Sequence, residues 1–243
     1  MKTRLDVLIF EKGLAETRTK AQALLMAGSV LVNGQQITKA GTLVDENSLI
    51  EIEKLNPYVS RGGLKLESVL GLFDIDFTDK VCMDIGASTG GFTDCMLQHG
   101  AKKVYSVDVG TAQLHYKLRQ DNRVINIENV NFRYFDKTLL KDSIEIITID
   151  VSFISLDKIL PLASEILDVN GFMIAMIKPQ FELSPKEVKK GVVRDDNLRF
   201  KAINKIKDCA KKLKLKIEKE ADSALKGPKG NLEHFVLFSR QSL

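Results

Sequence analysis

The sequence predicts an α/β protein whose main domain is a mostly parallel seven-stranded sheet, preceded by a small α+β unit. Two observations carry this prediction. From residue 60 onward, short apolar runs alternate with segments of helical periodicity, as in a sheet covered by helices on both faces. Residues 4–53 instead carry two short helical patterns followed by β segments. We therefore divide the chain into a domain at 1–53, a linker at 54–59 and a second domain at 60–243.

The first domain is expected to contain two helices and then a small antiparallel sheet. The first helical pattern stops at Gly13, and the second can be capped by Thr17 and stop at Gly28. An Asn-Gly pair at 33–34 lies between apolar runs, which is a strong signal for a β-hairpin. Residues 54–58 interrupt these patterns with Asn and Pro and are typical of a linker.

The second domain offers seven apolar runs as candidate strands, at 81–85, 103–107, 124–127, 144–149, 172–177, 214–219 and 233–238. Helical patterns lie between most of them, including those at 91–99, 112–119, 156–167 and 199–213. Strands separated by helices predict parallel pairing. No helix separates the last two strands, so these two could pair antiparallel at one edge of the sheet.

Composition argues against a membrane-spanning or secreted protein. No apolar run approaches the roughly 18 to 20 residues that a bilayer requires, and the N-terminus lacks the pattern of a secretory signal. The three cysteines do not have the spacing of metal ligands and are expected to be reduced core thiols. We expect a cytoplasmic protein that needs no metal.

Positive charge is concentrated in two zones of the sequence. The net charge is only +4, yet residues 185–219 hold thirteen Lys and Arg against five Asp and Glu, and residues 1–44 hold six against three. Two basic zones suit a polyanionic partner such as a nucleic acid. Part of the charge at 201–216 has a simpler explanation, because apolar residues at helical spacing make these lysines the outer face of a helix.

The first domain resembles the α-L RNA-binding motif of ribosomal small-subunit protein four, pseudouridine synthases and tyrosyl-tRNA synthetases. The matching residues are Arg4-Leu5-Asp6, Gly13-Leu14-Ala15, Arg18, Ala21, Gly28-Ser29-Val30 and Val32-Asn33-Gly34. The resemblance implies that Arg4, Arg18 and Lys20 contact the RNA backbone. Cations that bind phosphate provide affinity and register but little base specificity. A module for protein contacts is the alternative.

A glycine-rich turn at 84–93 is the candidate cofactor loop. It follows an apolar run and precedes a helical pattern, and its glycines allow a ligand to approach the backbone closely. Ser88 stands where a dinucleotide fingerprint has its second glycine. The Asp84-x-Gly86 start and the Gly90-Gly91 pair resemble instead the S-adenosylmethionine loop of class I methyltransferases. Asp108 ends the next strand, where a carboxylate can accept the ribose hydroxyls of either an S-adenosylmethionine or an NAD cofactor.

Four charged residues are expected at strand ends or turns near this loop. Asp150 and Lys178 each follow an apolar strand directly, and such carboxyl ends can be neighbours over the cofactor crevice. Lys65 follows Arg61 and two glycines, and Glu233 begins the last strand. A lysine amine in that crevice could hydrogen-bond to a ribose 2′-hydroxyl or accept its proton, with Asp150 orienting the amine. For Lys178 alone, a surface charge at a strand end is the alternative.

Over nearly its whole length the chain resembles the TlyA family of rRNA cytidine 2′-O-methyltransferases, historically labelled haemolysins. The motifs are the run 84–93, Asp150-Val-Ser-Phe-Ile-Ser155, Ile177-Lys-Pro-Gln-Phe-Glu182, Gly191-Val-Val-Arg-Asp195 and Lys226-Gly-Pro-Lys-Gly-Asn231. The second domain is similar to FtsJ-type 2′-O-methyltransferases. This similarity implies a class I, Rossmann-like methyltransferase fold and places the catalytic Lys-Asp-Lys-Glu tetrad on Lys65, Asp150, Lys178 and Glu233.

The same resemblance implies S-adenosyl-L-methionine as cofactor and rRNA within a ribosomal subunit as partner. Its cofactor contacts fall on Asp84, Gly86, Ser88, Gly90, Gly91, Asp108, Asn129 and Val130. RNA contacts in this domain are expected at Arg61, Lys189, Lys190 and Arg194. The short N-terminus favours 23S rRNA over 16S rRNA, and no protein partner is evident. The alternatives are an NAD-dependent enzyme, a non-catalytic RNA-binding or ribosome-assembly factor, and a haemolysin-type membrane-active protein.

Overall fold

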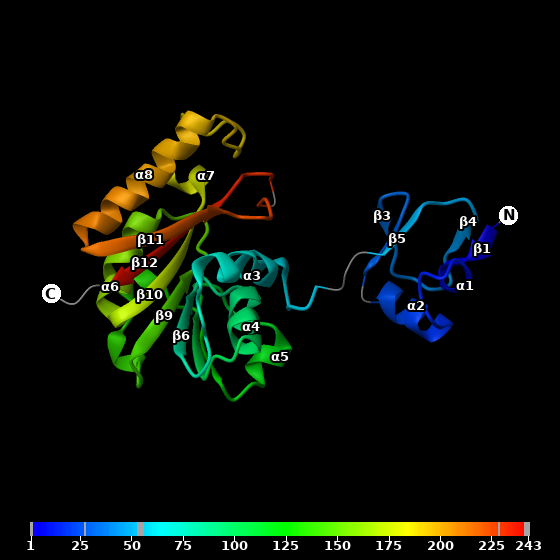
Figure 1. The fold of residues 1–243 in the computed structure, drawn as a ribbon, viewed down its shortest axis with the longest axis horizontal. Coiled ribbons are helices and arrows are strands. Elements are labelled where there is room, and N and C mark those ends of the chain that lie inside the picture. The colour runs from blue at the N-terminus through cyan, green and yellow to red at the C-terminus, as the bar shows by residue number, and fades with distance from the viewer. Residues whose placement is uncertain (1, 27, 53–55, 228, 241–243) are drawn as a thin grey trace. The chain divides into compact units, whose positions relative to one another are not determined.

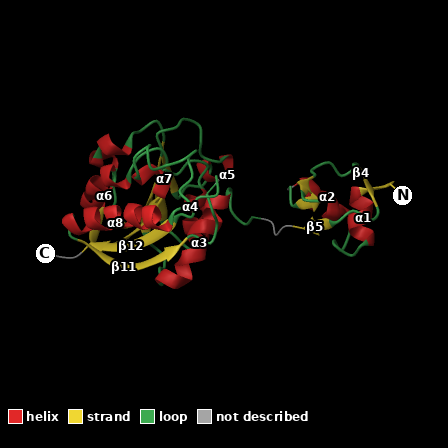
Figure 2. Cartoon of the chain, turned by 90° about the horizontal axis from the view of Figure 1, so that it is seen from above, coloured by secondary structure: helices red, strands yellow, loops and turns green. Residues whose placement is uncertain are grey.

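The computed structural model describes residues 2–26, 28–52, 56–227 and 229–240, which belong to two compact units, Met1–Pro57 and Tyr58–Leu243. Each unit contains both helices and strands (Figure 2). Residues 53–55, which include part of the predicted linker, lie outside the described residues, as does residue 228 of the motif at 226–231.

Apart from a first short strand, the N-terminal unit has the predicted order of two helices and then short strands. Its helices are α1 (Leu5–Glu11) and α2 (Arg18–Met26), and its strands are β1 (Lys2–Arg4), β2 (Val30–Val32), β3 (Gln35–Gln36), β4 (Leu43–Asp45) and β5 (Ile50–Ile52). The predicted hairpin is confirmed, because β2 and β3 pair antiparallel around Asn33 and Gly34, both with positive φ. Thr17 caps α2 through a bond from the Lys20 N–H. Strand β1, which pairs with β4, was not predicted.

The C-terminal unit, Tyr58–Leu243, is built on a sheet with the strand order β11-β12-β10-β9-β6-β7-β8. The strands are β6 (Val81–Ile85), β7 (Lys103–Val107), β8 (Val124–Ile127), β9 (Ile144–Ile149), β10 (Leu167–Ile177), β11 (Leu215–Asp222) and β12 (His234–Arg240). Strands β6 to β10 pair in parallel, whereas β12 is antiparallel to both β10 and β11. The predicted parallel sheet with an antiparallel pair at one edge is therefore confirmed.

Helices cover both faces of this sheet, and the carboxyl ends of β6, β9 and β10 lie at the same edge (Figure 1). On one face α3 (Arg61–Phe73), α4 (Gly91–Gln98) and α5 (Tyr116–Arg119) pack into one apolar core. On the other face α6 (Leu160–Ile166) and α8 (Asp196–Lys212) pack into a second core. Short helix α7 (Pro179–Glu182) follows β10, and three 3₁₀ turns complete the unit, at Phe132–Tyr134, Lys137–Leu139 and Leu156–Lys158.

Two local predictions are wrong. Lys65 does not lie at a strand end or turn but in the second turn of α3. Ser60 caps this helix by accepting a bond from the Gly62 N–H, and apolar side chains such as Leu66 and Val69 recur at helical spacing. The glycine pair at 62–63 made the segment look like a turn. The predicted helix at 112–119 is helical only at Tyr116–Arg119, because three N–H groups of the preceding loop bond to the side chain of Glu128 instead.

Candidate active site

A cavity of about 540 Å³ lies over the carboxyl ends of β6, β9 and β10. The loop after β6, the residues that follow β9 and β10, the start of α3 and the segment before β12 all contribute to its wall. Of the predicted site residues, the wall contains Arg61, Lys65, Asp84, Gly86, Ser88, Gly91, Asp150, Lys178 and Glu233. The structure therefore brings the four predicted catalytic residues into one cavity.

Lys178 and Asp150 form the first charged pair of this cavity. Lys178 directly follows β10 and Asp150 directly follows β9, and these strands are parallel neighbours. The Lys178 Nζ lies 2.6 Å from Asp150 Oδ1 and donates a hydrogen bond of 2.9 Å to the Ser152 hydroxyl. The contact with Asp150 is an ion pair without hydrogen-bond alignment, and within the described residues that buried Oδ1 has no hydrogen-bond partner. One acceptor position beside the lysine is thus left open.

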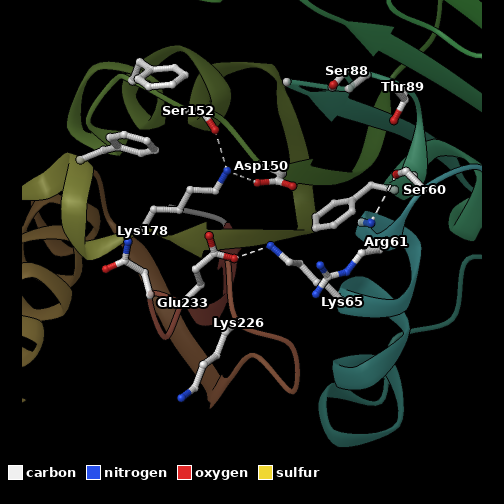
Figure 3. A pocket seen from close by; sticks show the side chains of 18 of the residues that line it. Ser60, Arg61, Lys65, Ser88, Thr89, Asp150, Ser152, Lys178, Lys226 and Glu233 are labelled. Carbon is white, nitrogen blue, oxygen red and sulfur yellow. Dashed lines mark hydrogen bonds and ion pairs between the residues drawn. The ribbon is translucent and has the colours of Figure 1, made fainter. Parts of the chain in front are cut away.

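Lys65 and Glu233 form the second charged pair. Lys65 comes from α3, and Glu233 immediately precedes β12. The Lys65 Nζ lies 2.5 Å from Glu233 Oε2, and the two side chains are 11% and 1% exposed. Figure 3 shows Lys65 and Lys178 each directed toward a carboxylate at the same cavity. Burying such pairs costs hydration, so they are weak evidence for stability and are typical of sites that carry out chemistry.

The loop after β6 needs its glycines for steric reasons. Gly86 has φ +84°, and a Cβ there would lie 2.8 Å from the carbonyl oxygen of Asp150. A Cβ on Gly91 would lie 2.3 Å from the Ser60 hydroxyl and 2.8 Å from the Gly63 nitrogen. The first turns of α3 and α4 therefore meet at the cavity. The partial positive charge at the N-termini of two helices favours a negatively charged ligand group at this position.

Asp84, at the base of this loop, is completely buried. Its carboxyl accepts hydrogen bonds from the Thr93 hydroxyl at 2.7 Å and from the Thr148 hydroxyl at 3.2 Å. Burial raises the pKa of Asp84 to about 7, and the nearby charge of Asp150 contributes in the same direction. Asp84 thus ties strand β6 to α4 and β9 beneath the cavity.

Four of the predicted cofactor residues do not line the cavity, and three of these form a cluster beside Ser88. Asp108 accepts bonds from the Ser88 N–H at 2.8 Å and the Gly110 N–H at 2.7 Å. The backbones of Asn129 and Val130 bond to the carbonyls of Gly110 and Asp108. A carboxylate has further acceptor positions, so Asp108 can still receive bonds from a ligand. Gly90 packs with φ +93° against Leu118, where a Cβ would lie 2.3 Å from the leucine methyl.

Exposed cations lie in the cavity wall and on either side of Gly191, which is part of that wall. Arg61 lines the cavity, whereas Lys189, Lys190 and Arg194 do not; all four are exposed and have no side-chain hydrogen bond or ion pair to the rest of the described chain. Sequence reasoning missed Lys226 and Lys229, which also line the cavity. Asn231 holds the two basic loops together, because its side chain accepts from the Val193 N–H and donates to the Gly191 carbonyl, both at 2.9 Å. Both lysines belong to the motif at 226–231, which could have indicated them, but they were not predicted to bind RNA.

Sequence reasoning also missed an aromatic pair in the cavity wall. Phe153 is 90% exposed and has φ +62°, and its ring centroid lies 5.0 Å from that of Phe181. Both residues line the cavity that holds Lys178. A phenylalanine held in solvent with a left-handed backbone is an uncommon arrangement that gathers at binding sites. The two motifs that contain these rings were quoted for the family resemblance, but the rings themselves carried no prediction.

A buried carboxylate, Glu182, connects the loops that carry Asp150 and Lys178. It ends α7, four residues after Lys178, and its side chain is 1% exposed. It accepts bonds from the Ser155 hydroxyl and from the Leu156 N–H (2.8 Å), and Lys205 of α8 lies 3.2 Å away. The Lys178–Asp150 ion pair and the Phe153–Phe181 aromatic pair bridge the same two loops at the cavity.

The remaining predicted RNA contacts differ in their surroundings. In the N-terminal unit, Arg4 and Arg18 both contact Asp6, and Lys20 pairs with Glu16 on the surface. The basic zone at 185–219 is partly neutralised. Each of five lysines in it has a carboxylate partner, in the pairs Lys201–Glu187, Lys205–Glu182, Lys207–Glu220, Lys211–Asp208 and Lys216–Glu218.

Comparison with known proteins identifies both units. A family model described as FtsJ-like methyltransferase matches residues 58–240, and a model described as S4 domain matches residues 3–50. Hemolysin A of Brachyspira hyodysenteriae is 46% identical over 97% of this chain and 99% of its own. The 16S/23S rRNA (cytidine-2'-O)-methyltransferase TlyA of Mycobacterium tuberculosis is 34% identical, over 99% of this chain and 91% of its own.

A solved structure agrees with these matches. A hemolysin-named protein from Streptococcus thermophilus superposes with a TM-score of 0.78 at 41% identity, covering 99% of this chain and 89% of its own. The mostly parallel sheet, the glycine loop and the two lysine–carboxylate pairs are thus found in a chain whose relatives are methyltransferases and hemolysin-named proteins. This chain, whose S4 domain precedes its methyltransferase domain, belongs to the FtsJ-like methyltransferase family, within the TlyA group.

Proposed function

We propose that this protein transfers a methyl group from S-adenosyl-L-methionine to the ribose 2′-hydroxyl of a cytidine in rRNA. The observation that carries the proposal is the pair of buried lysine–carboxylate contacts, Lys178–Asp150 and Lys65–Glu233, that face one cavity beside a glycine-rich loop. The substrate class comes from the TlyA relative, whose name states cytidine 2′-O-methylation of rRNA.

The residues present fit the proposed cofactor. The cavity of about 540 Å³ is in the range of about 300 to 1,000 Å³ typical of small-molecule sites. The joined first turns of α3 and α4, with Arg61 beside them, suit the carboxylate of an amino acid. Asp108 has acceptor positions left for ribose hydroxyls. When bound, S-adenosylmethionine supplies a methyl group that is already electrophilic.

In the proposed reaction, the protein aligns a hydroxyl and removes its proton. Ser152 uses one hydrogen-bonding position of the Lys178 amine, and Asp150 fixes the direction of the side chain. In its neutral form, after its own extra proton has gone to solvent, the Lys178 amine accepts the 2′-hydroxyl proton as the oxygen takes the methyl group, and that proton then also passes to solvent. Lys65 and Glu233 hold the ribose in place, which supplies the alignment that such a transfer requires.

The cavity wall also suits the base and the phosphates of an RNA strand. Duplex RNA hides base edges in a deep groove, so an enzyme that reaches one ribose at close range acts on an unstacked or flipped nucleotide. Phe153 and Phe181 offer aromatic faces on which such a base can stack. Outside the wall, Lys189, Lys190 and Arg194 are exposed and have no carboxylate partner within the described part of the chain, so they are available for phosphates.

The test supplies labelled methyl donor to purified 30S and 50S ribosomal subunits and to the free rRNAs, with wild-type protein and Lys178→Ala. We expect label in the 2′-O-methyl group of one cytidine, and no label with the variant. Label on 50S alone would assign 23S rRNA, and label on both subunits would match the M. tuberculosis relative. Equal labelling by the two proteins would remove Lys178 from its role.

The same experiment separates the competing functions. Normal RNA binding by wild-type protein with no transfer of label would favour a non-catalytic ribosome-assembly factor. The hemolysin name of the Brachyspira relative suggests a membrane-active protein, for which liposome leakage is the direct test. Within the described residues, no helix has the length and apolar character needed to cross a bilayer.

A further inference from the structure

Asp6 is the most highly bonded carboxylate of the N-terminal unit. It lies in the first turn of α1 and is 0% exposed. Arg4 donates to it through Nε at 3.0 Å and through Nη2 at 3.1 Å, and Arg18 donates through Nε at 2.9 Å. Gln22 of α2 adds a fourth bond at 2.8 Å. One buried side chain thus fixes two arginines that are far apart in sequence.

The charges of this cluster do not cancel. Two guanidinium groups share one carboxylate, and the Arg4 guanidinium, with Gln22 and Arg18, holds the pKa of Asp6 well below its usual range. The arginine side chains remain 48% and 50% exposed. An arginine has five N–H donors, so most of the donors of this pair are still free. The cluster presents excess positive charge and free donors on the surface.

We propose that Asp6 is a positioning residue that holds Arg4 and Arg18 together as one preorganised phosphate-binding pair. This inference rests on the proposed RNA-binding function of the N-terminal unit. Two unpaired guanidiniums this close would repel each other, and each long side chain would lose rotamer freedom on binding. A buried carboxylate between the two guanidinium groups removes the repulsion. The arginine side chains then lose their rotamer freedom when the protein folds, so this loss does not reduce the free energy of RNA binding.

A second acid–base pair in the same unit provides a matched control. Glu16 pairs with Lys20, one turn later in sequence, but both side chains are mostly exposed, at 81% and 61%. Such a surface pair holds its lysine only loosely. Neutralising Glu16 and neutralising Asp6 change the net charge by the same amount, so an effect of charge alone is equal in the two variants.

The test measures binding of the full-length protein to a fluorescein-labelled RNA duplex by anisotropy, for wild type, Asp6→Asn and Glu16→Gln. Each variant gains one unit of positive charge, which by itself strengthens binding to RNA. We expect Asp6→Asn to bind about ten-fold more weakly, since the two arginine side chains must then be ordered when RNA binds. Glu16→Gln should bind as tightly as wild type or more tightly. Wild-type or tighter binding by Asp6→Asn would overturn the inference.

A double-variant background distinguishes positioning from loss of folding. If Asp6 acts through the arginines, Asp6→Asn causes no further loss of RNA affinity in a protein that already carries Arg4→Gln and Arg18→Gln. A persistent loss in that background would show that the substitution damages the unit as a whole, and would also overturn the inference. If the two arginine substitutions alone leave RNA affinity unchanged, the proposed RNA contact itself fails, which is a separate result.

Discussion

Asp6 in the N-terminal unit and Asp84 in the catalytic unit are both completely buried, yet they differ in the partners that surround them. Asp6 accepts bonds from two arginines and a glutamine, whereas Asp84 accepts bonds from two threonine hydroxyls. The cationic partners lower the pKa of Asp6, and burial raises the pKa of Asp84 to about 7. Burial alone therefore does not decide the charge of a carboxyl group; its hydrogen-bond donors do.

The same contrast separates the two charged sites of the molecule. The Asp6 cluster has an excess of cations and keeps its arginines half exposed, as binding to a polyanion requires. In the active-site cavity, Lys178 and Lys65 each have one carboxylate and are nearly buried. Such a balanced, dehydrated site suits the handling of a single proton. We therefore expect substitutions in the Asp6 cluster to change RNA binding, and substitutions in the cavity to change the rate of methyl transfer.

The largest expected effect is the loss of methyl transfer in Lys178→Ala. Removing a positioned acid–base group typically lowers a rate by about 10²- to 10⁴-fold, and this variant also leaves the charge of Asp150 unpaired. RNA affinity should stay within about two-fold of wild type, because a single buried cation adds little to phosphate binding. Single-turnover rates and anisotropy measure the two quantities. A proportional loss of RNA affinity would contradict the division between docking and chemistry.

The next effect concerns stability and pH. Because Asp84 has a higher pKa in the folded protein than in the unfolded chain, its stabilising contribution is present below about pH 4 and is lost as the pH rises through about 7. A shift of this size corresponds to at most about 4 kcal/mol. His234, whose pKa burial lowers, acts in the opposite direction in this window. The contribution of Asp6, whose pKa is lowered, is lost only at more acidic pH.

The free energy of unfolding of the C-terminal unit is measured by urea titration at pH 5 and at pH 8, for wild type and for Asp84→Asn. We expect Asp84→Asn to lose less free energy of unfolding between the two pH values than wild type does. The contribution of His234 is common to both proteins and cancels in this difference. The same pH dependence in the two proteins would show that Asp84 does not titrate in this range.

A smaller effect is expected from the two arginines of the N-terminal unit. Replacing both Arg4 and Arg18 by Gln should weaken RNA binding by about 10- to 100-fold and reduce the slope of log affinity against log salt by about two. The rate at saturating RNA should remain close to that of wild type, because neither residue belongs to the cavity wall. A change in that rate with unchanged affinity would reverse the roles assigned to the two sites.

Glu182→Gln is expected to lower the single-turnover rate by about ten-fold, as hydrogen bonds to a charged group are worth about 1.5–3 kcal/mol. The buried carboxylate holds the loop of Asp150 against that of Lys178, so its loss should change the pH profile of the rate as well. Glu145→Gln is the matched control, because Glu145 also accepts from a lysine and a backbone N–H but lies at the opposite end of β9. Equal effects of the two variants would exclude a positioning role for Glu182.

The strands of the parallel sheet, and the positions of Asp150 and Lys178 at their ends, could be predicted from sequence because they depend on local pattern. Asp150 and Lys178 follow continuous apolar runs, and parallel strands bring such ends together. Lys65 was predicted to lie at a strand end or turn because Gly62 and Gly63, which are uncommon within helices, occupy the first turn of helix α3. Phe153 could not be found, since its importance lies in an exposed ring and a left-handed backbone that no pattern of polarity shows. The pattern of residues likewise did not show which lysines form ion pairs with carboxylates in the folded protein.

The smallest effect is expected from the lysines of α8, and it follows from that pairing. Lys211 lies 3.3 Å from Asp208, and Lys207 lies 2.8 Å from Glu220, so the thirteen cations counted at 185–219 overstate the free positive charge. Lys211→Ala should leave RNA affinity within about two-fold of wild type and its salt slope unchanged. Lys189→Ala, which removes an exposed lysine without a carboxylate partner in the described chain, should reduce that slope by about one. Equal slopes for the two variants would mean that charge count, rather than pairing, determines which lysines bind RNA.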